Sequence, residues 1–318
     1  MKTTVILLLV LFLFISCTND EQIESNSCGG SKYTCIPDSI FEQHLIDEGI
    51  DSDGLNGRVL TSEISGITRL LVSGRKIKDL TGVEGFISLI ELYCDGNQLT
   101  SLGLSNNTYL EVLYCMENQI TSLDFSNNTS LKVLFCSQNL ITSLNISNNA
   151  SLETLICYDN QLTSLDTSNN TSLGFLWCGG NAITSLDISN NTSLENLTCY
   201  KNQLTSLNIS NNTSLQWFTC NDNQITSLDI SNNISLKSLG CDNNQLTSLD
   251  ISNNTSLEGL NCTGNQLTSL DISNNTSLQW LSCSRNPLFC IKVNQTQFDN
   301  IPTDWVKDSD DTYSLDCL

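Results

Sequence analysis

The chain has 318 residues, a formal net charge of −21 at pH 7, 15 cysteines and one histidine. A charge this negative makes nucleic acids and anionic membrane surfaces unfavourable partners. A Ser-His-Asp or Cys-His catalytic group would have to be built on the sole histidine, His44. His44 stands in a short predicted helix beside the apolar residues Phe41, Leu45 and Ile46, which favours a packed histidine. The sequence therefore predicts no enzyme and no cofactor.

Residues 1–16 form a predicted signal peptide. Lys2 precedes an apolar run that is too short to span a membrane comfortably. Phe14–Cys17 then resembles the lipobox of bacterial lipoproteins, with Phe14 where leucine is more usual. The resemblance implies that Cys17 is lipidated and anchors the protein in the bacterial outer membrane, exposed at the cell surface. The acidic residues that follow resemble the surface-export signals of Bacteroidetes lipoproteins.

Residues 17–35 have the small, polar composition of a tether, and residues 36–66 are a predicted N-terminal cap. Cys28 and Cys35 bracket the end of the tether, and an exported location favours a disulfide between them. Ser39 and Glu42 have the spacing of a capping box, and Gly49 is expected to end the helix that they begin. This helix would cover the open end of the first coil, as stacked repeats require.

Ten cysteines recur every 21 residues from Cys94 to Cys283, with no insertion or deletion. A period of this size predicts a solenoid of stacked coils. Each coil reads Leu-x-x-Leu-x-Cys-x-x-Asn-x-Leu, beginning at Leu89. A second half-repeat, such as 246–256, alternates apolar and polar residues as a strand does. We infer parallel sheets on two opposite sides of the coils, with turns at two columns of asparagines.

This pattern resembles the leucine-rich repeat, with cysteine in place of the third leucine. The first coil, from Ile67, resembles the internalin type, and the nested halves resemble the short bacterial class called IRREKO. The resemblance spans residues 67–286. It implies a right-handed, mostly β leucine-rich-repeat solenoid with a parallel sheet on the concave side, short strands or extended segments opposite, and a small helical N-cap. Residues 287–318 resemble the closing unit of Bacteroidetes leucine-rich-repeat surface proteins, which implies a Cys290–Cys317 disulfide.

The column of ten thiols has three interpretations. A linear column cannot supply four converging ligands to a metal, so no metal is predicted. Neighbouring strands lie about 4.8 Å apart with parallel side chains, whereas a disulfide needs converging Cβ atoms roughly 3.5–4.5 Å apart. Buried, unreactive thiols are therefore favoured over disulfides between coils. The asparagines from Asn97 to Asn286 are expected to bond the backbone of the turns.

Recognition is expected at outward strand positions that vary between coils. Large side chains, most of them aromatic, occupy the position before the cysteine in the first five coils and recur nearby. Contiguous exposed apolar area of this kind marks interaction sites. The predicted ligand-binding residues are Tyr93, Tyr114, Phe135, Ile156, Trp177, Phe175, Trp217, Tyr158 and Tyr200. The predicted partner is a protein or a surface glycan; the alternative is a structural or adhesion spacer, in which stacked aromatics only stabilise neighbouring strands.

Two acidic features offer weaker hypotheses. Aspartates one coil apart repel each other, which a divalent cation could relieve, although solvated carboxylates are the simpler interpretation. The segment 51–57 resembles a calcium loop, but Ser62 stands at the twelfth place, where a bidentate acid is needed. The aspartate column consists of Asp124, Asp166, Asp187, Asp229, Asp250 and Asp271.

Overall fold

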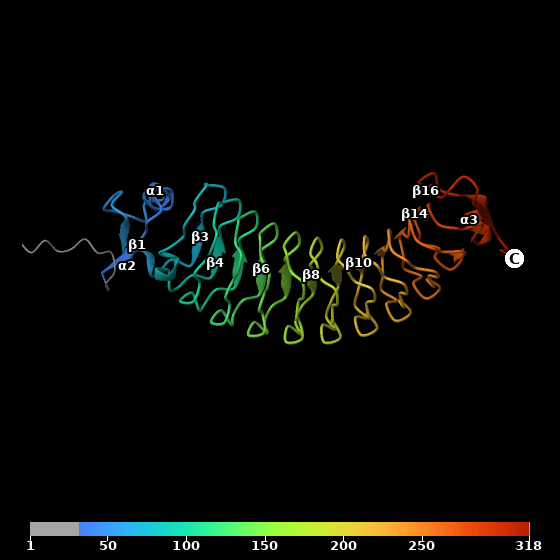
Figure 1. Ribbon diagram of the computed structural model, residues 1–318, viewed down its shortest axis with the longest axis horizontal. Coiled ribbons are helices and arrows are strands. Elements are labelled where there is room, and N and C mark those ends of the chain that lie inside the picture. The colour runs from blue at the N-terminus through green and yellow to red at the C-terminus, as the bar shows by residue number, and fades with distance from the viewer. Residues whose placement is uncertain (1–31, 318) are drawn as a thin grey trace, which may run out of the picture.

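The protein is described by a computed structural model over residues 32–317, which form one curved solenoid (Figure 1). The predicted signal peptide, Cys17 and Cys28 lie outside these residues, so the lipidation site and the Cys28–Cys35 pairing stay predictions. Over residues 32–317, no helix combines the length and the apolar character needed to cross a membrane.

Short strands alternate with turns, and helices occur only near the two ends. The helices are α1 (Ser39–Asp47), α2 (Thr61–Ile64), the 3-10 helix η1 (Val83–Gly85) and α3 (Gln295–Asp299). The strands are β1 (Tyr33–Cys35), β2 (Arg58–Leu60), β3 (Arg69–Leu71), β4 (Glu91–Tyr93), β5 (Val112–Tyr114), β6 (Val133–Phe135), β7 (Thr154–Ile156), β8 (Phe175–Trp177), β9 (Asn196–Thr198), β10 (Trp217–Thr219), β11 (Ser238–Gly240), β12 (Gly259–Asn261), β13 (Leu270–Asp271), β14 (Trp280–Ser282), β15 (Cys290–Lys292), β16 (Trp305–Val306) and β17 (Thr312–Ser314).

One parallel sheet of 12 strands runs the length of the molecule, from β3 to β16. Residues 21 apart pair along it, as Leu113 does with Leu134, because every coil places the same position at the same height. In Figure 1 the coils form an arc, and the strand arrows point toward its inner edge, so the turns after the strands line that edge. The predicted leucine-rich-repeat solenoid is confirmed.

The second half-repeat forms less sheet than expected. In the described chain its pairing is limited to β13, β15 and β17 and to one bridge between Asp124 and Asn145; the rest is extended. Along this side each aspartate or asparagine accepts the N–H of the serine two residues on, as Asp166 does from Ser168 at 2.9 Å. The same bond is made at Asp271 within β13, so this side of every coil has the same local turn whether or not it pairs as a strand.

The interior is a stack of leucine, isoleucine and cysteine columns held together by two columns of buried asparagines. Asn118 donates from its Nδ2 to the carbonyls of Cys94 and Cys115, and its Oδ1 accepts from the N–H of Leu99. In the second column, Asn128 donates to the carbonyls of Leu104 and Asn107. Each amide thus bridges two coils, as predicted for the first column.

The N-terminal cap differs in detail from its prediction. Asp38, not Ser39, caps α1, because its Oδ1 accepts from the N–H groups of Ile40 and Phe41. Glu42 does not complete a capping box; its buried Oε1 accepts from three backbone N–H groups, those of residues 56–58. Strand β1 pairs with β2, so residues 33–35, assigned to the tether, belong to the cap.

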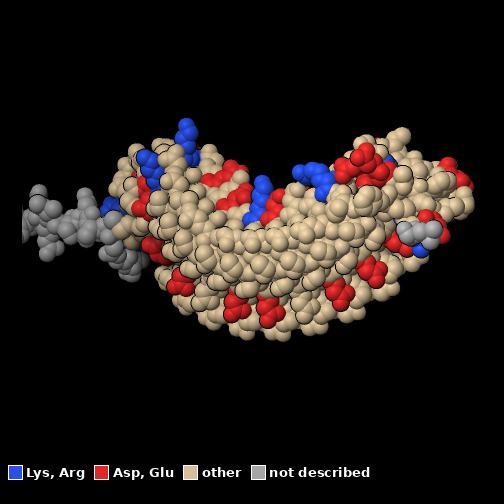
Figure 2. All heavy atoms as spheres, turned by 45° about the vertical axis from the view of Figure 1, so that its right-hand side comes forward, with Lys and Arg blue, Asp and Glu red and all other residues tan. Residues whose placement is uncertain are grey.

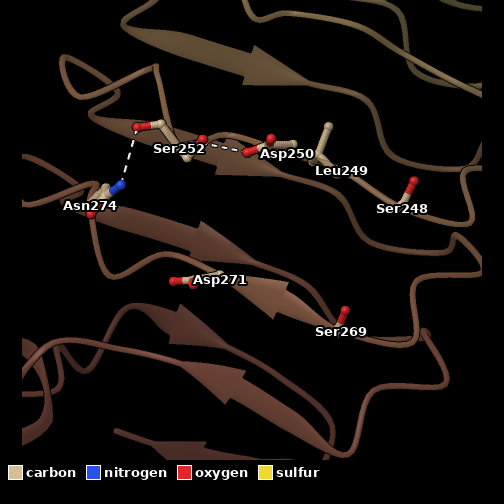
Figure 3. Close-up of a pocket in the computed structure, with 7 residues that line it drawn as sticks. All are labelled: Ser248, Leu249, Asp250, Ser252, Ser269, Asp271 and Asn274. Atoms are coloured by element: carbon tan, nitrogen blue, oxygen red, sulfur yellow. Dashed lines mark hydrogen bonds between the residues drawn. The ribbon is translucent and has the colours of Figure 1, made fainter. Parts of the chain in front are cut away.

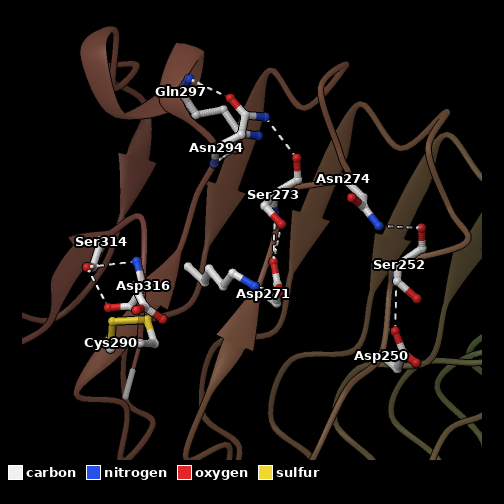
Figure 4. A network of polar contacts seen from close by, with 12 residues as sticks. Asp250, Ser252, Asp271, Ser273, Asn274, Cys290, Asn294, Gln297, Ser314 and Asp316 are labelled. Carbon is white, nitrogen blue, oxygen red and sulfur yellow. Dashed lines mark hydrogen bonds and ion pairs between the residues drawn. A yellow bond between two sulfur atoms is a disulfide. The ribbon is translucent and has the colours of Figure 1, made fainter.

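The C-terminal cap continues the coil geometry with different side chains (Figure 4). Strand β16 pairs with β14 as the next coil would, and Cys290 forms a disulfide with Cys317, with 5.7 Å between the Cα atoms. Asn294 donates to the carbonyl of Ser273, and Gln297 donates to those of Ile272 and Asn275. The Gln297 bonds replace the second asparagine column where the repeat ends, because Asn275 makes the equivalent bonds to Ile251 and Asn254.

Candidate interaction face

The aromatic face is the outward surface of the sheet formed by Tyr93, Tyr114, Phe135 and Trp177 with Tyr158 and Tyr200 at the strand exits. The in-register strands bring the first three rings into one stack, with centroids 4.8 Å apart for Tyr93–Tyr114 and 4.3 Å apart for Tyr114–Phe135. Burial in this stack is the largest cause that raises the pKa of Tyr114, and the charge of neighbouring Tyr93 is the second. The stack is half-buried, so it stabilises the sheet and also presents an apolar edge to a partner.

On its N-terminal side the stack ends beside two residues of opposite charge, Arg69 and Glu91. The Arg69 guanidinium lies 5.2 Å from the centroid of the Tyr93 ring, and its Nε lies 3.0 Å from Glu91 Oε2. The Tyr93 hydroxyl donates to the same carboxylate at 3.2 Å. These contacts fix the first ring and give this end of the face a polar border.

Ile156 does not reach the surface. It follows Phe135 in register and precedes Trp177, and it is only 6% exposed. An aliphatic side chain between two large rings is covered by them. Ile156 is therefore a packing residue beneath the aromatic face, and its contribution to recognition is limited to holding its neighbours.

A shallow hollow lies at the C-terminal end of the aromatic face. Tyr158, Trp177, Thr198 and Tyr200 line its volume of about 360 Å³. A Cβ on Gly179 would clash with the Tyr200 ring, so the absence of a side chain there lets Tyr200 lie across the column. The Trp177 Nε1 donates to Asn196 Oδ1 at 2.9 Å. Thr198, Gly179 and Asn196 were not predicted as site residues. The sequence signal that could have indicated them is Gly179, which stands between Tyr158 and Tyr200 in the column that follows the cysteines.

Three further aromatic side chains lie apart from the stack, in the outward column three residues before each cysteine of the ladder. Phe175 and Trp217 are 40% and 41% exposed, and Trp280 is 42% exposed. Trp217 carries the Lys237 Nζ at 5.4 Å from its ring centroid. These rings are separated by small polar residues, and they do not join the stack of Tyr93, Tyr114 and Phe135.

The thiol ladder lies directly behind this face. All ten cysteines of the ladder are free and buried, which confirms the predicted packing column. Burial raises the pKa of Cys178 and of Cys241 to about 12. The thiols are thus protonated and shielded at neutral pH, where neither metal binding nor exchange chemistry is favoured.

The aspartate column occupies the other broad side, where Figure 2 shows acidic side chains spaced along the outer part of the arc. The N–H and hydroxyl of Ser126 lower the pKa of Asp124, and the N–H of Ser189 lowers that of Asp187 despite the opposing charge of Asp166. Asp250 and Asp271 line a groove with serines and Asn274 (Figure 3). Local hydrogen bonds already compensate these carboxylates, and residues 32–317 contain no cluster of three metal-ligating side chains.

The cap residues considered in the sequence do not form a reactive site. His44 is 4% exposed, and burial together with the charge of Arg75 lowers its pKa, so it is a neutral, packed side chain. Asp51 is also buried, and its Oδ1 accepts from the N–H of Asp53 at 3.2 Å. The bond closes a turn within the segment 51–57.

Comparison with known proteins identifies the architecture by structure alone, because no family model and no curated protein matches the chain. The functional domain of InlJ from Listeria monocytogenes, described as including a cysteine ladder, is 26% identical with a TM-score of 0.68, covering 88% of this chain and 71% of its own. The internalin InlF from the same organism is 23% identical, with a TM-score of 0.54 and coverage of 86% and 96%.

A receptor ectodomain from a plant has the same fold. The leucine-rich-repeat ectodomain of the receptor kinase GASSHO1/SCHENGEN3 from Arabidopsis thaliana, solved with CASPARIAN STRIP INTEGRITY FACTOR 2, is 25% identical with a TM-score of 0.65. The match covers 74% of this chain and 31% of that one. The chain has the leucine-rich-repeat solenoid fold, and bacterial internalins are among the structures that it resembles.

Proposed function

We propose that the protein is a lipid-anchored bacterial surface protein that binds another protein, without catalysis, through its aromatic face. The observation that carries the proposal is the half-buried ring stack that continues into the hollow between Trp177 and Tyr200. Aromatic residues at the centre of an apolar patch are typical of binding hot spots. The anchor rests on the lipobox-like segment at Cys17, and a surface glycan is the other partner that the face could accept.

The test is a combined variant, Tyr114→Ser, Phe135→Ser and Trp177→Ser. Purified protein is mixed with surface proteins of the source cells, and captured proteins are identified by mass spectrometry. The matched control replaces Thr121, Thr142 and Thr163 with alanine; all three are exposed and outside the sheet. The proposal predicts one defined protein that the wild type and the control retain and the face variant loses.

A structural spacer is the second candidate, and the ring stack is also the observation that favours it. If the rings serve the sheet alone, the same triple variant loses several degrees of melting temperature and the wild type captures nothing that the variant does not. If the face serves recognition, the wild type captures one defined partner that the folded variant loses, even though the variant also melts at a lower temperature because the rings stabilise the sheet. Capture by the wild type therefore separates the two functions.

A further inference from the structure

Two neighbouring glycines, Gly179 and Gly180, lie in the middle coil of the hollow, just after Trp177 and the ladder cysteine of that coil. A Cβ on Gly179 would clash with the Tyr200 ring, which comes from the next coil. A Cβ on Gly180 would clash with the Asp159 carboxylate, which comes from the previous coil. The space that two side chains would otherwise fill is therefore occupied from one side by an aromatic ring and from the other by an acid.

Backbone conformation does not account for the glycine at position 180. Its φ is 62°, in the left-handed region, but Asp159 and Lys201 hold the equivalent position in the neighbouring coils with φ of 52° and 46°. Other residues are thus tolerated at this turn, and what glycine adds at 180 is space. Burial, and after it the charge of Asp159, raises the pKa of Tyr200, so the acid and the ring act on each other.

The described chain supplies no cation to this hollow. The Asp159 carboxylate is exposed, and no lysine, arginine or histidine among residues 32–317 pairs with it. Other rings on the same sheet have a cation of this protein beside them. The Arg69 guanidinium lies 5.2 Å from the Tyr93 ring centroid, and the Lys237 Nζ lies 5.4 Å from that of Trp217. No described lysine or arginine lies in this way over the three rings of the hollow.

We infer that the hollow is a cation-binding site that receives a lysine or arginine side chain of the partner protein. Aromatic faces attract ammonium and guanidinium groups, and the neighbouring Asp159 carboxylate adds an attraction between opposite charges. The hydrocarbon stem of either side chain can pack on the rings at the same time. An uncharged group would also pack on the rings, but it would cover the carboxylate without pairing it. The inference rests on the proposed function and names the kind of residue that the aromatic face recognises.

The test uses choline, a cation with a fixed charge, and 3,3-dimethylbutanol, which has the same shape without the charge. Saturation-transfer NMR measures the binding of each to the purified protein. We expect choline to bind at least about fivefold more tightly than the alcohol. Asp159→Asn, which keeps the shape of the side chain, and Trp177→Ala should each weaken choline binding by about fivefold. The matched control is Trp217→Ala, which removes a ring that Lys237 already faces and should leave choline binding unchanged.

The inference is overturned if choline does not bind or binds no more tightly than the alcohol. It is also overturned if Asp159→Asn and Trp177→Ala, shown to be folded by circular dichroism, bind choline as the wild type does. None of these outcomes requires a known partner. The proposed function fails separately, if the capture experiment finds no protein that depends on the aromatic face. If a protein is captured, Asp159→Asn should reduce its capture; undiminished capture would overturn the inference and leave the proposed function intact.

Discussion

At the scale of single residues, the repeat assigns each side chain a role by its column, and neighbouring columns differ sharply in chemistry. A cysteine of the ladder is fully buried, while the residue before it faces outward. The asparagine three positions later is satisfied by four backbone partners in two coils, as Asn202 shows with Cys178, Cys199, Tyr200 and Ile183. Substitutions in adjacent columns are therefore expected to have unrelated effects.

Asn202→Ala should destabilise the protein by about 2–3 kcal/mol, because two carbonyls and one N–H lose their partners in a buried place. The matched variant is Asn211→Ala, whose exposed amide makes one bond, to the Ser189 carbonyl at 3.2 Å. Chemical denaturation measures both. Equal losses for the two variants would show that burial of the amide column does not determine its importance.

The ladder thiols should react slowly in the native protein. The raised pKa of Cys178 and Cys241, about 12 in each case, keeps almost no thiolate at pH 8, and burial excludes the reagent. Ten thiols should become reactive together on unfolding, which a colorimetric thiol assay in increasing denaturant would follow. Rapid labelling of most of them under native conditions contradicts the packing role.

Asp51 predicts a pH dependence in the cap. Burial, with the nearby charges of Asp53 and Glu42, raises the pKa of Asp51 from 3.8 to about 6. The folded protein therefore holds a proton that the unfolded chain releases, and stability falls as the pH rises from about 4 to about 6, then levels. Asp51→Asn should flatten the melting temperature over this window and raise it at pH 8. An unchanged profile would exclude Asp51 as its source.

At the scale of elements, sequence pattern predicted what the repeat enforces and missed what local hydrogen bonds decide. The Leu-x-x-Leu-x-Cys pattern specified ten of the twelve strands of the long sheet, all but β3 and β16, and the outward residues on them. It did not predict that Asp166 and its equivalents accept the N–H of the serine two residues on, nor that the second sheet is limited to β13, β15 and β17. Asp38, rather than Ser39, caps the helix. Both side chains can accept a hydrogen bond from the backbone, and the tertiary position of the loop determines which one does.

The candidate site was predictable as a surface but not as a shape. The columns placed Tyr114, Phe135 and Trp177 on one face, since every strand has the same register. Burial of Ile156 and the hollow beside Tyr200 depend on how neighbouring rings lean, and a column pattern carries no such information. The glycine at 179, which has no side chain to display, leaves the space in which the Tyr200 ring lies.

The C-terminal disulfide should stabilise the last coil. Replacing Cys290 and Cys317 together with serine removes a crosslink across 27 residues and should cost about 3 kcal/mol. Hydrogen exchange should then accelerate first in β15 and β17, while β7 to β9 stay protected, since a coil contacts only its neighbours. Uniform acceleration along the chain would contradict this local role.

At the scale of the whole molecule, the protein is a linear stack whose stability adds coil by coil. Deleting a whole coil, 236–256, rejoins identical positions and should leave a folded solenoid with a modestly lower melting temperature. Deleting the half coil 246–256 puts the leucine, cysteine and asparagine columns out of register and should prevent cooperative folding. Circular dichroism melts of both would decide; similar melts would mean that register does not govern the fold.

Recognition through the outward face of the sheet can be tested with a site-specific photo-crosslinker. The crosslinker is placed at Thr198, in the hollow, or at the exposed Thr205 outside the sheet, and irradiated with surface extracts of the source cells. We expect one defined crosslinked partner from position 198 and none from position 205. The same products from both positions, or none from position 198, would contradict it.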